Sequence, residues 1–120
     1  GAELIAIHKN RFWQTDFGLK MDIGGFVVAL EYASGKPALT IGKPSADFFR
    51  MALKSMDLSA SDVAIIGDDI DSDVGGAQAV GMTGILVKTG KFREEYVAQS
   101  RVTPDWVIDS IRELPAFLSR

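Results

Sequence analysis

A short acidic cluster contains the residues most able to do chemistry. Asp68, Asp69, Asp71 and Asp73 fall within six residues. Their carboxylates repel one another, which disfavours the charged forms unless a cation is present. A hard cation that prefers oxygen ligands, such as Mg²⁺, relieves that repulsion. The cluster therefore indicates a Mg²⁺ site, and the alternative is an acidic turn in which Asp73 caps a helix.

A lysine between two predicted elements is the second candidate. Lys43 lies in the segment Gly42-Lys43-Pro44, after an apolar run and before a helix. As a compact point charge, a lysine here can neutralise a phosphate and a nearby carboxylate, although most lysines are simply solvated. The segment is not a P-loop, because it lacks the earlier glycine and a Ser or Thr after the lysine. His8, the single imidazole, is a further candidate for substrate contact or acid–base chemistry.

The elements that must position these residues are predicted from apolar runs and their periodicity. The runs predict strands over residues 4–7, 38–41, 63–66, 83–88 and 104–108, and a short return strand over 12–14. Helical patterns lie between them and begin at residues that often cap helices. The expected helices start at Asp22 (ending at Gly35), at Ser45, near Asp73 (ending at Gly81), and at Asp109, the last with Ile111, Leu114 and Leu118 inward.

The alternation of strands and helices indicates the fold class. The central strands are apolar along their whole length, so we expect them to be buried on both faces of a parallel sheet. The expected fold is α/β, with a Rossmann-like parallel sheet and flanking helices. In such sheets, ligands bind at the carboxyl ends of strands. Both Lys43 and the acidic cluster follow a predicted strand directly.

Composition narrows the class of protein. The 120 residues are enough for one domain of modest size. A net charge of −3 without a basic stripe argues against general nucleic-acid binding, and no apolar run is long enough to span a membrane. There is no cysteine, which excludes thiolate metal sites and fits a cytoplasmic location.

Taken in order, the motifs resemble the later half of haloacid dehalogenase (HAD) superfamily phosphatases. Gly42-Lys43-Pro44 resembles the third motif of that superfamily, and residues 65–73 resemble the fourth, metal-binding motif. Residues 73–81 and 84–91 are similar to the NagD-like branch, which carries an α/β cap. Residues 4–11 resemble the end of that cap. The resemblance therefore covers essentially the whole chain.

The resemblance implies a Mg²⁺-dependent phosphatase that acts on a small phosphorylated substrate through an aspartyl-phosphate. It places residues 1–41 at the end of the cap and residues 42–120 in the C-terminal part of the HAD-like core. Lys43 and Asp73 would be catalytic, and Gly42, Lys43 and Pro44 would lie at the substrate. Asp68 would bind Mg²⁺ directly. Asp69 and Asp73 would hold the metal through water, or position Lys43.

The sequence departs from the family in one respect. No Asp-x-Asp pair follows a strand before the cap, and the Ser or Thr of the second motif is missing. We therefore expect the N-terminal half of the same protein to be absent and this chain to be inactive alone. The strands at 38–41 and 63–66 would then have open apolar edges, which a partner, for example in a homodimer, would cover.

Two alternatives remain from the sequence. One is a non-catalytic module that binds Mg²⁺ and phosphate or contacts a partner. The other is a receiver domain, which is also α/β with an acidic pocket and a lysine. The order of the motifs argues against the receiver domain, because there the lysine follows the acidic residues, whereas Lys43 precedes them.

Overall fold

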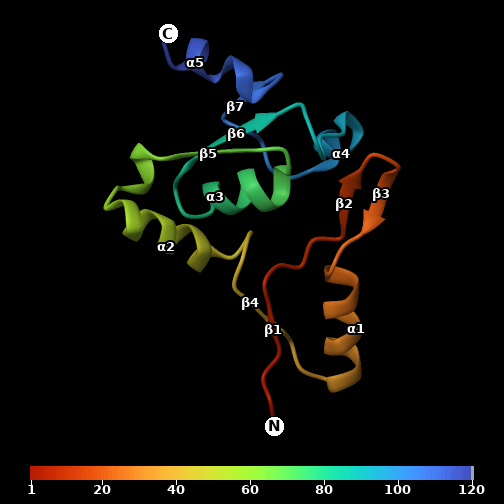
Figure 1. The fold of residues 1–120 in the computed structure, drawn as a ribbon. Coiled ribbons are helices and arrows are strands. Elements are labelled where there is room, and N and C mark those ends of the chain that lie inside the picture. Colours follow the sequence, from red (N-terminus) through yellow and green to blue (C-terminus); the bar gives the residue numbers. More distant parts are fainter. Residues whose placement is uncertain (120) are drawn as a thin grey trace.

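The sheet that carries the acidic cluster has three parallel strands. The computed structural model describes residues 1–119 and places β6 between β5 and β7 (Figure 1). The register pairs Gly67 of β5 with Leu86 of β6, so these strands end at the same edge. In chain order the elements are β1 (Ile5–Ala6), β2 (Phe12–Thr15), β3 (Gly18–Met21), α1 (Gly24–Ser34), β4 (Leu39–Thr40), α2 (Ala46–Met56), η1 (Ala60–Asp62), β5 (Ala64–Gly67), η2 (Ile70–Gly75), α3 (Gly76–Gln78), β6 (Thr83–Val87), α4 (Glu94–Gln99), β7 (Trp106–Ile108), η3 (Ile111–Glu113) and α5 (Leu114–Leu118).

Helical segments cover both faces of this sheet. On one face, Leu86 of β6 packs against Val74 of η2. On the other face, Val87 packs with Ile108, and Phe117 of α5 lies against them. Successive residues of β6 thus point to opposite apolar layers, as a strand buried on both faces requires. The α/β parallel sheet with flanking helices is confirmed.

The N-terminal part of the chain contains two further strand pairs. β1 pairs with β4 in parallel, and β2 pairs with β3 as an antiparallel hairpin. The short strand predicted over residues 12–14 is present as β2, but it pairs with β3 and does not return along β1. The cause is the turn after Thr15, whose hydroxyl accepts a hydrogen bond from the N–H of Phe17 and donates one to the carbonyl of Gly18. That turn directs the chain into β3.

The predicted helix ends are partly correct. Gly35 ends α1 in the left-handed region, with φ of 65°, and Ser45 occupies the cap position of α2, although its side chain makes no capping bond. Asp22 does not occupy the cap position of α1, because Ile23 does. The Asp22 carboxylate instead accepts a hydrogen bond from the N–H of Ile23 at 2.7 Å.

The C-terminal helix differs more from the prediction. Ser110, not Asp109, caps the segment, accepting a hydrogen bond from the N–H of Arg112. The 3₁₀ turn η3 precedes α5 and changes the phase of the helix. As a result Ile111 and Leu118 are exposed rather than inward, and Phe117 packs on the sheet in their place.

The outer edge of β5 has no partner strand within residues 1–119, as expected. Whether the cap ends near residue 41 stays a prediction. In the part of the chain that the structure describes, no helix is both long and apolar enough to cross a membrane.

Candidate active site

Lys43 and Asp73 form an ion pair between segments 30 residues apart in the chain. Lys43 Nζ lies 2.5 Å from Oδ1 of Asp73, whose side chain is only 7% exposed. The other oxygen of Asp73 accepts a hydrogen bond from the N–H of Asp69 at 3.2 Å. The carboxylate lies against Gly67, where any Cβ would overlap it. Asp73 is thus held so that it can orient the ammonium group of Lys43.

Asp69 caps the helical segment that follows the acidic loop. Its Oδ1 accepts hydrogen bonds from the N–H groups of Asp71 and Ser72, at 3.2 and 3.0 Å. Its Oδ2 lies 3.3 Å from Nζ of Lys91. Burial raises the pKa of the Asp69 carboxyl, but the hydrogen bonds from Ser72 and the charge of Lys91 outweigh it, so the pKa lies below its usual value. The expectation that repulsion disfavours the charged form is therefore wrong for Asp69.

Asp68 lies at the carboxyl end of β5, beneath the loop that follows β6. Its Oδ2 accepts a hydrogen bond from the N–H of Lys91 at 2.8 Å. Gly90 precedes this amide with φ of 57°, and a Cβ there would overlap the Asp68 carboxylate. Within residues 1–119, Oδ1 of Asp68 accepts no hydrogen bond. This oxygen is therefore available to a ligand.

Asp71 points away from these groups, toward α4. Its carboxylate accepts hydrogen bonds from the hydroxyl groups of Tyr96 and Ser100. The hydrogen bond to Asp71, together with burial and the nearby carboxylate charges, raises the pKa of Tyr96 to about 12. Asp71 therefore joins α4 to η2 and does not contribute to the group around Asp68.

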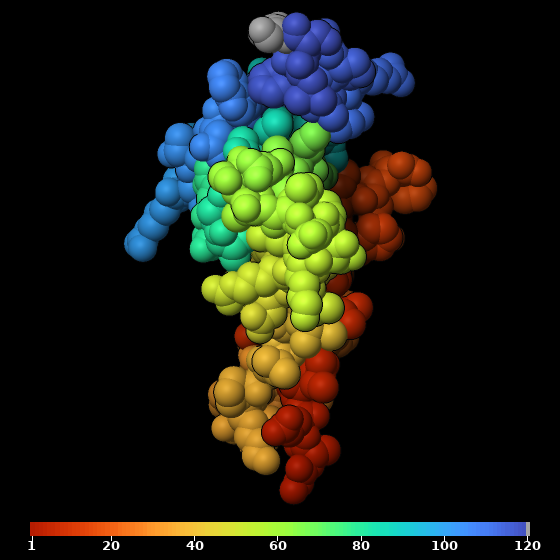
Figure 2. Space-filling model, turned by 90° about the vertical axis from the view of Figure 1, so that its left-hand side faces the viewer, coloured from red at the N-terminus to blue at the C-terminus, as the bar shows by residue number. Residues whose placement is uncertain are grey.

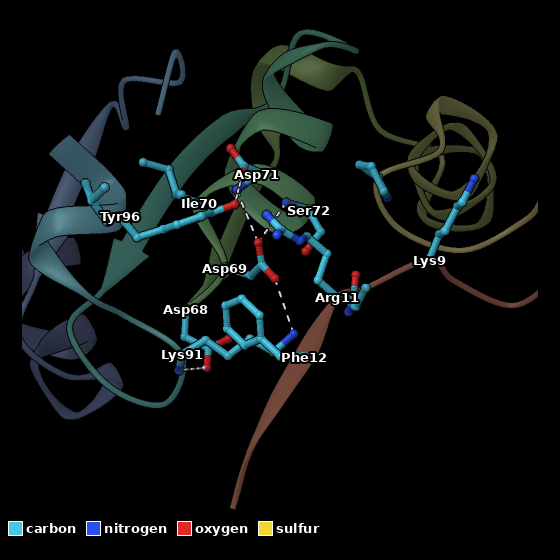
Figure 3. A pocket seen from close by; sticks show the side chains of 13 residues that line it. Lys9, Arg11, Phe12, Asp68, Asp69, Ile70, Asp71, Ser72, Lys91 and Tyr96 are labelled. Atoms are coloured by element: carbon cyan, nitrogen blue, oxygen red, sulfur yellow. Dashed lines mark hydrogen bonds and ion pairs between the residues drawn. The ribbon is translucent and has the colours of Figure 1, made fainter. Parts of the chain in front are cut away.

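Asp68, Asp69 and Asp71 line a pocket of about 180 Å³ (Figure 3), whereas Lys43 and Asp73 are not among its lining residues. Residues 68–72 form one wall, and residues 9–11 of the connection between β1 and β2, together with Phe12 of β2, form another. Pro44, Lys91, Tyr96 and Val97 complete the lining. The pocket thus joins the two parts of the chain that the sequence assigns to the cap and the core.

Of the three predicted substrate residues, Gly42 and Lys43 are not among the residues that line this pocket. Pro44 lines it. Lys43 is partly exposed beside Asp73, and Gly42 lies against the carbonyl of Ile7, where a side chain would not fit. His8 lies outside the lining; its Nδ1 accepts a hydrogen bond from the N–H of Asn10, and its Nε2 lies 3.9 Å from Oδ1 of Asp22.

The donor atoms at the acidic loop fit Mg²⁺ with one direct protein ligand. Within residues 1–119, no group of three or more His, Cys, Asp or Glu side chains is arranged to hold a metal ion. Both oxygens of Asp69 and both of Asp73 accept hydrogen bonds, whereas Asp68 has an oxygen without one. Mg²⁺ keeps several waters and commonly takes one or two carboxylates. Asp68 therefore fits a direct ligand, and Asp69 and Asp73 fit contacts through water.

Sequence reasoning did not single out Lys91, Arg11 or Tyr96, which all line the pocket. Lys91 lies in the loop after β6, four residues beyond Val87, so the rule that ligands lie at carboxyl ends of strands would have indicated this loop. No comparable sequence pattern indicated Arg11 or Tyr96 as residues of the site. Tyr96 lies on α4, which no clear periodicity predicted, and Arg11 reaches the pocket only through the path of the chain between β1 and β2.

A family model described as HAD-hydrolase-like matches residues 40–114. The chain belongs to the HAD-like hydrolases. This HAD-like chain is 44% identical over 110 residues to the phospholysine phosphohistidine inorganic pyrophosphate phosphatase of Rattus norvegicus, covering 92% of this chain and 41% of that protein. Its structure matches that of a p-nitrophenyl phosphatase from Archaeoglobus fulgidus, with a TM-score of 0.82, 32% identity, and coverage of 96% of this chain and 46% of that chain.

A second solved structure is similar to this HAD-like chain and contains a metal ion. It is a glycerol phosphate phosphatase from Mycobacterium tuberculosis in complex with magnesium, with a TM-score of 0.80 and 28% identity. The match covers 95% of this chain and 35% of that chain. The resemblance to the NagD-like branch is confirmed. The chain spans about two fifths of the length of the curated relatives that it matches.

Proposed function

We propose that this chain forms the part of a phosphatase that binds Mg²⁺ and orients the lysine for phosphoryl transfer from a small phosphorylated metabolite. The observation that carries the proposal is the Lys43–Asp73 ion pair, together with the unpaired oxygen of Asp68, the residue that directly follows β5. An ammonium held by a carboxylate, and a second carboxylate with an available oxygen, suit a site where charge must be neutralised. The magnesium in the related glycerol phosphate phosphatase supports the choice of metal.

Each residue has a distinct task in this proposal. Asp73 accepts a hydrogen bond from Lys43 and so directs Nζ toward the transferring phosphoryl group. Asp68 would hold Mg²⁺ directly, with Asp69 and Asp73 behind water molecules. Bound Mg²⁺ supplies charge neutralisation and orients the groups for in-line displacement. Pro44 shapes the wall of the pocket, and Gly42 sets the path of the loop that carries Lys43.

The proposed reaction runs through a covalent aspartyl-phosphate. An aspartate attacks phosphorus while the bond from phosphorus to the leaving group breaks, and the leaving group takes a proton. Water then hydrolyses the aspartyl-phosphate. Within residues 1–119, no strand ends in an Asp-x-Asp pair outside the acidic cluster. The nucleophile would therefore come from outside these residues, and we expect no turnover by this chain alone.

The test combines metal binding with turnover. We would titrate the chain with Mg²⁺ by isothermal titration calorimetry and assay hydrolysis of p-nitrophenyl phosphate. Asp68→Asn should weaken Mg²⁺ binding at least about tenfold, equivalent to about 1.4 kcal/mol. Asp47→Asn is the matched control, because Asp47 is an exposed aspartate of α2 outside the pocket. This substitution should leave the affinity for Mg²⁺ unchanged.

Two outcomes would contradict parts of the proposal. If the chain does not bind Mg²⁺, or binds it equally well with Asp68→Asn, the metal site is wrong. If the chain itself hydrolyses the ester in a reaction that needs Mg²⁺ and Asp68, the nucleophile lies within the chain, and the covalent scheme must be reassigned.

A non-catalytic module that binds Mg²⁺ and phosphate is the second candidate. Two observations favour it. The residues proposed to hold metal and phosphate are present, and within residues 1–119 no other strand ends in an Asp-x-Asp pair that could supply the nucleophile. Retained binding of Mg²⁺ and orthophosphate by the natural full-length protein, without any turnover, would establish it. A cytoplasmic location and a homodimer also stay predictions.

A further inference from the structure

Three cationic side chains line the pocket, and carboxylates engage two of them. They are Lys9, Arg11 and Lys91. Nζ of Lys91 lies 3.3 Å from Oδ2 of Asp69, and Nζ of Lys9 lies 2.5 Å from Oε2 of Glu31. The charges of both lysines are therefore compensated within the chain.

Arg11 is the exception among these cations. Within residues 1–119, its guanidinium makes neither an ion pair within 4.0 Å nor a side-chain hydrogen bond. Figure 3 shows its side chain directed from the connection between β1 and β2 toward the wall that contains Asp69 and Ser72. The guanidinium of Arg11 is therefore a planar, permanently charged donor group that faces the pocket and has no partner within residues 1–119.

Asp71, the carboxylate near Arg11, already has other hydrogen-bond donors. Both oxygens of Asp71 already accept hydrogen bonds, from Tyr96 and Ser100. The hydrogen bond to Asp71 raises the pKa of Tyr96, and the charge of Arg11 partly opposes that rise. The guanidinium is thus within electrostatic range of the Tyr96 hydroxyl. Arg11 therefore lies near the part of the pocket lined by Tyr96 of α4. Asp68 lines the same pocket, as does Pro44, which follows Lys43 in the chain.

We propose that Arg11 determines specificity by binding an anionic group on the leaving-group side of the substrate. The inference rests on the proposed function, because it takes the phosphoryl group to lie at Lys43 and Asp68. A guanidinium binds carboxylate or phosphate through two parallel hydrogen bonds. The pocket, at about 180 Å³, is smaller than the roughly 300–1,000 Å³ of sites for drug-sized ligands. The substrate class is therefore a small phosphate ester or anhydride with a second anionic group.

The test compares ligands that differ in that second charge. Binding to the chain would be measured by isothermal titration calorimetry with Mg²⁺ present, so that turnover is not required. Phosphoglycolate and ethyl phosphate share the phosphate and a similar size, but only phosphoglycolate adds a carboxylate. Pyrophosphate supplies a second phosphate in place of the carboxylate. We expect at least one of the two charged ligands to bind about tenfold more tightly than ethyl phosphate.

Variants then test whether the tighter binding of the charged ligands depends on Arg11. Arg11→Gln should abolish it, and Arg11→Lys should keep part of it, because lysine retains the charge without the planar fork. Lys20→Gln is the matched control: it removes one exposed positive charge from the neighbouring strand β3, outside the pocket, and should leave the preference intact. Because Arg11 is exposed and has no partner within residues 1–119, its variants should unfold like the parent chain.

The outcomes separate the sources of the anionic group. An Arg11-dependent preference for phosphoglycolate assigns a carboxylate, and one for pyrophosphate assigns a second phosphate; either supports the proposal. Equal binding of all three ligands, no binding of any, or a preference that survives Arg11→Gln would overturn it. Mg²⁺ binding that depends on Asp68 without any such preference would refute this inference and leave the proposed function standing.

Discussion

At the scale of single residues, each aspartate of the acidic cluster has a different set of hydrogen-bond partners. Asp69 caps η2 and pairs with Lys91, Asp71 holds α4, and Asp73 holds Lys43. Asp68 keeps one oxygen available. Repulsion among these carboxylates is relieved by backbone N–H groups and two lysines as well as by any bound cation.

Removing the charge of Asp73 tests its role as a structural partner. Asp73→Asn keeps the size of the side chain but leaves Lys43 without its carboxylate. We expect urea unfolding to show a loss of about 1–3 kcal/mol, because a nearly buried, hydrogen-bonded carboxylate is replaced. Asp109→Asn is the control, since its ion pair with Lys88 is exposed and should contribute little. Equal effects of the two changes would argue that the Lys43 pair is also weak.

Gly90 offers a second test at this scale. Gly90→Ala should cost about 1–2 kcal/mol for the left-handed backbone conformation, and in addition displace Asp68, whose carboxylate a Cβ would overlap. Gly35→Ala is the matched control: its φ of 65° is similar, but nothing lies within 4 Å of a Cβ there. We expect both variants to lose stability in urea, and only Gly90→Ala to lose Mg²⁺ binding as well. Unchanged Mg²⁺ binding in Gly90→Ala would contradict the placement of the metal at Asp68.

At the scale of elements, the side chains of Tyr96 and Arg93 fix the position of α4 beside the pocket. Tyr96 donates its hydroxyl to Asp71, and its ring packs edge-on against Phe12 with centroids 6.5 Å apart. Arg93, which precedes α4, also donates a hydrogen bond to Gln14 of β2. These contacts join α4 to both η2 and the β2–β3 hairpin, so α4 is the element through which the two walls of the pocket are held together.

The ionisation of Tyr96 tests this link. In a Tyr32→Phe background, Tyr96 is the one tyrosine left, and its absorbance change should occur at about pH 12. The pKa in the folded state is raised, so the hydrogen bond contributes stability that is fully present below about pH 10 and is lost as the pH rises toward 12. Asp71→Asn should move the ionisation toward about pH 10, and Asp47→Asn should not. An unchanged titration in Asp71→Asn would show that α4 is not held by Asp71.

At the scale of the whole molecule, the chain is elongated. Its principal extents are 54, 38 and 24 Å, and Figure 2 shows the N-terminal residues forming a narrow end below the sheet-bearing part. On the β1–β4 pair, Ile5, Ile7, Leu39 and Ile41 are all at least half exposed. Ile5 and Leu39 are direct neighbours in the parallel register, so these four side chains form a continuous apolar β1–β4 face and not solitary exposed residues.

We expect that face to drive self-association. Sedimentation velocity should show a sedimentation coefficient that rises with concentration, because two such faces bury one another. Ile7→Lys should reduce the association, since it places a charge in the contact. Leu118→Lys, which changes an equally exposed residue at the far end of the chain, should not. A coefficient that is independent of concentration in the parent chain would show that the face remains solvated.

The sequence by itself determined what is local. Apolar runs located the parallel strands, the turn after Ser34 required Gly35, and the order of the Gly-Lys-Pro segment and the acidic loop indicated the family and the edge of the sheet where the site lies. These features depend on neighbouring residues and on periodicity, which a single chain displays directly. The predicted helix starts at Asp22 and Asp109 were each one residue off, because several polar residues near a start can satisfy the first N–H groups.

Only the tertiary structure decided which charges meet. Lys43 pairs with Asp73, Lys91 with Asp69, and Asp71 with Tyr96, and the members of these pairs lie 30, 22 and 25 residues apart. Such contacts depend on how loops from different strands cross at one edge of the sheet, and spacing along the chain does not specify that. For the same reason the sequence indicated an acidic site but left open which of its oxygens a ligand can reach.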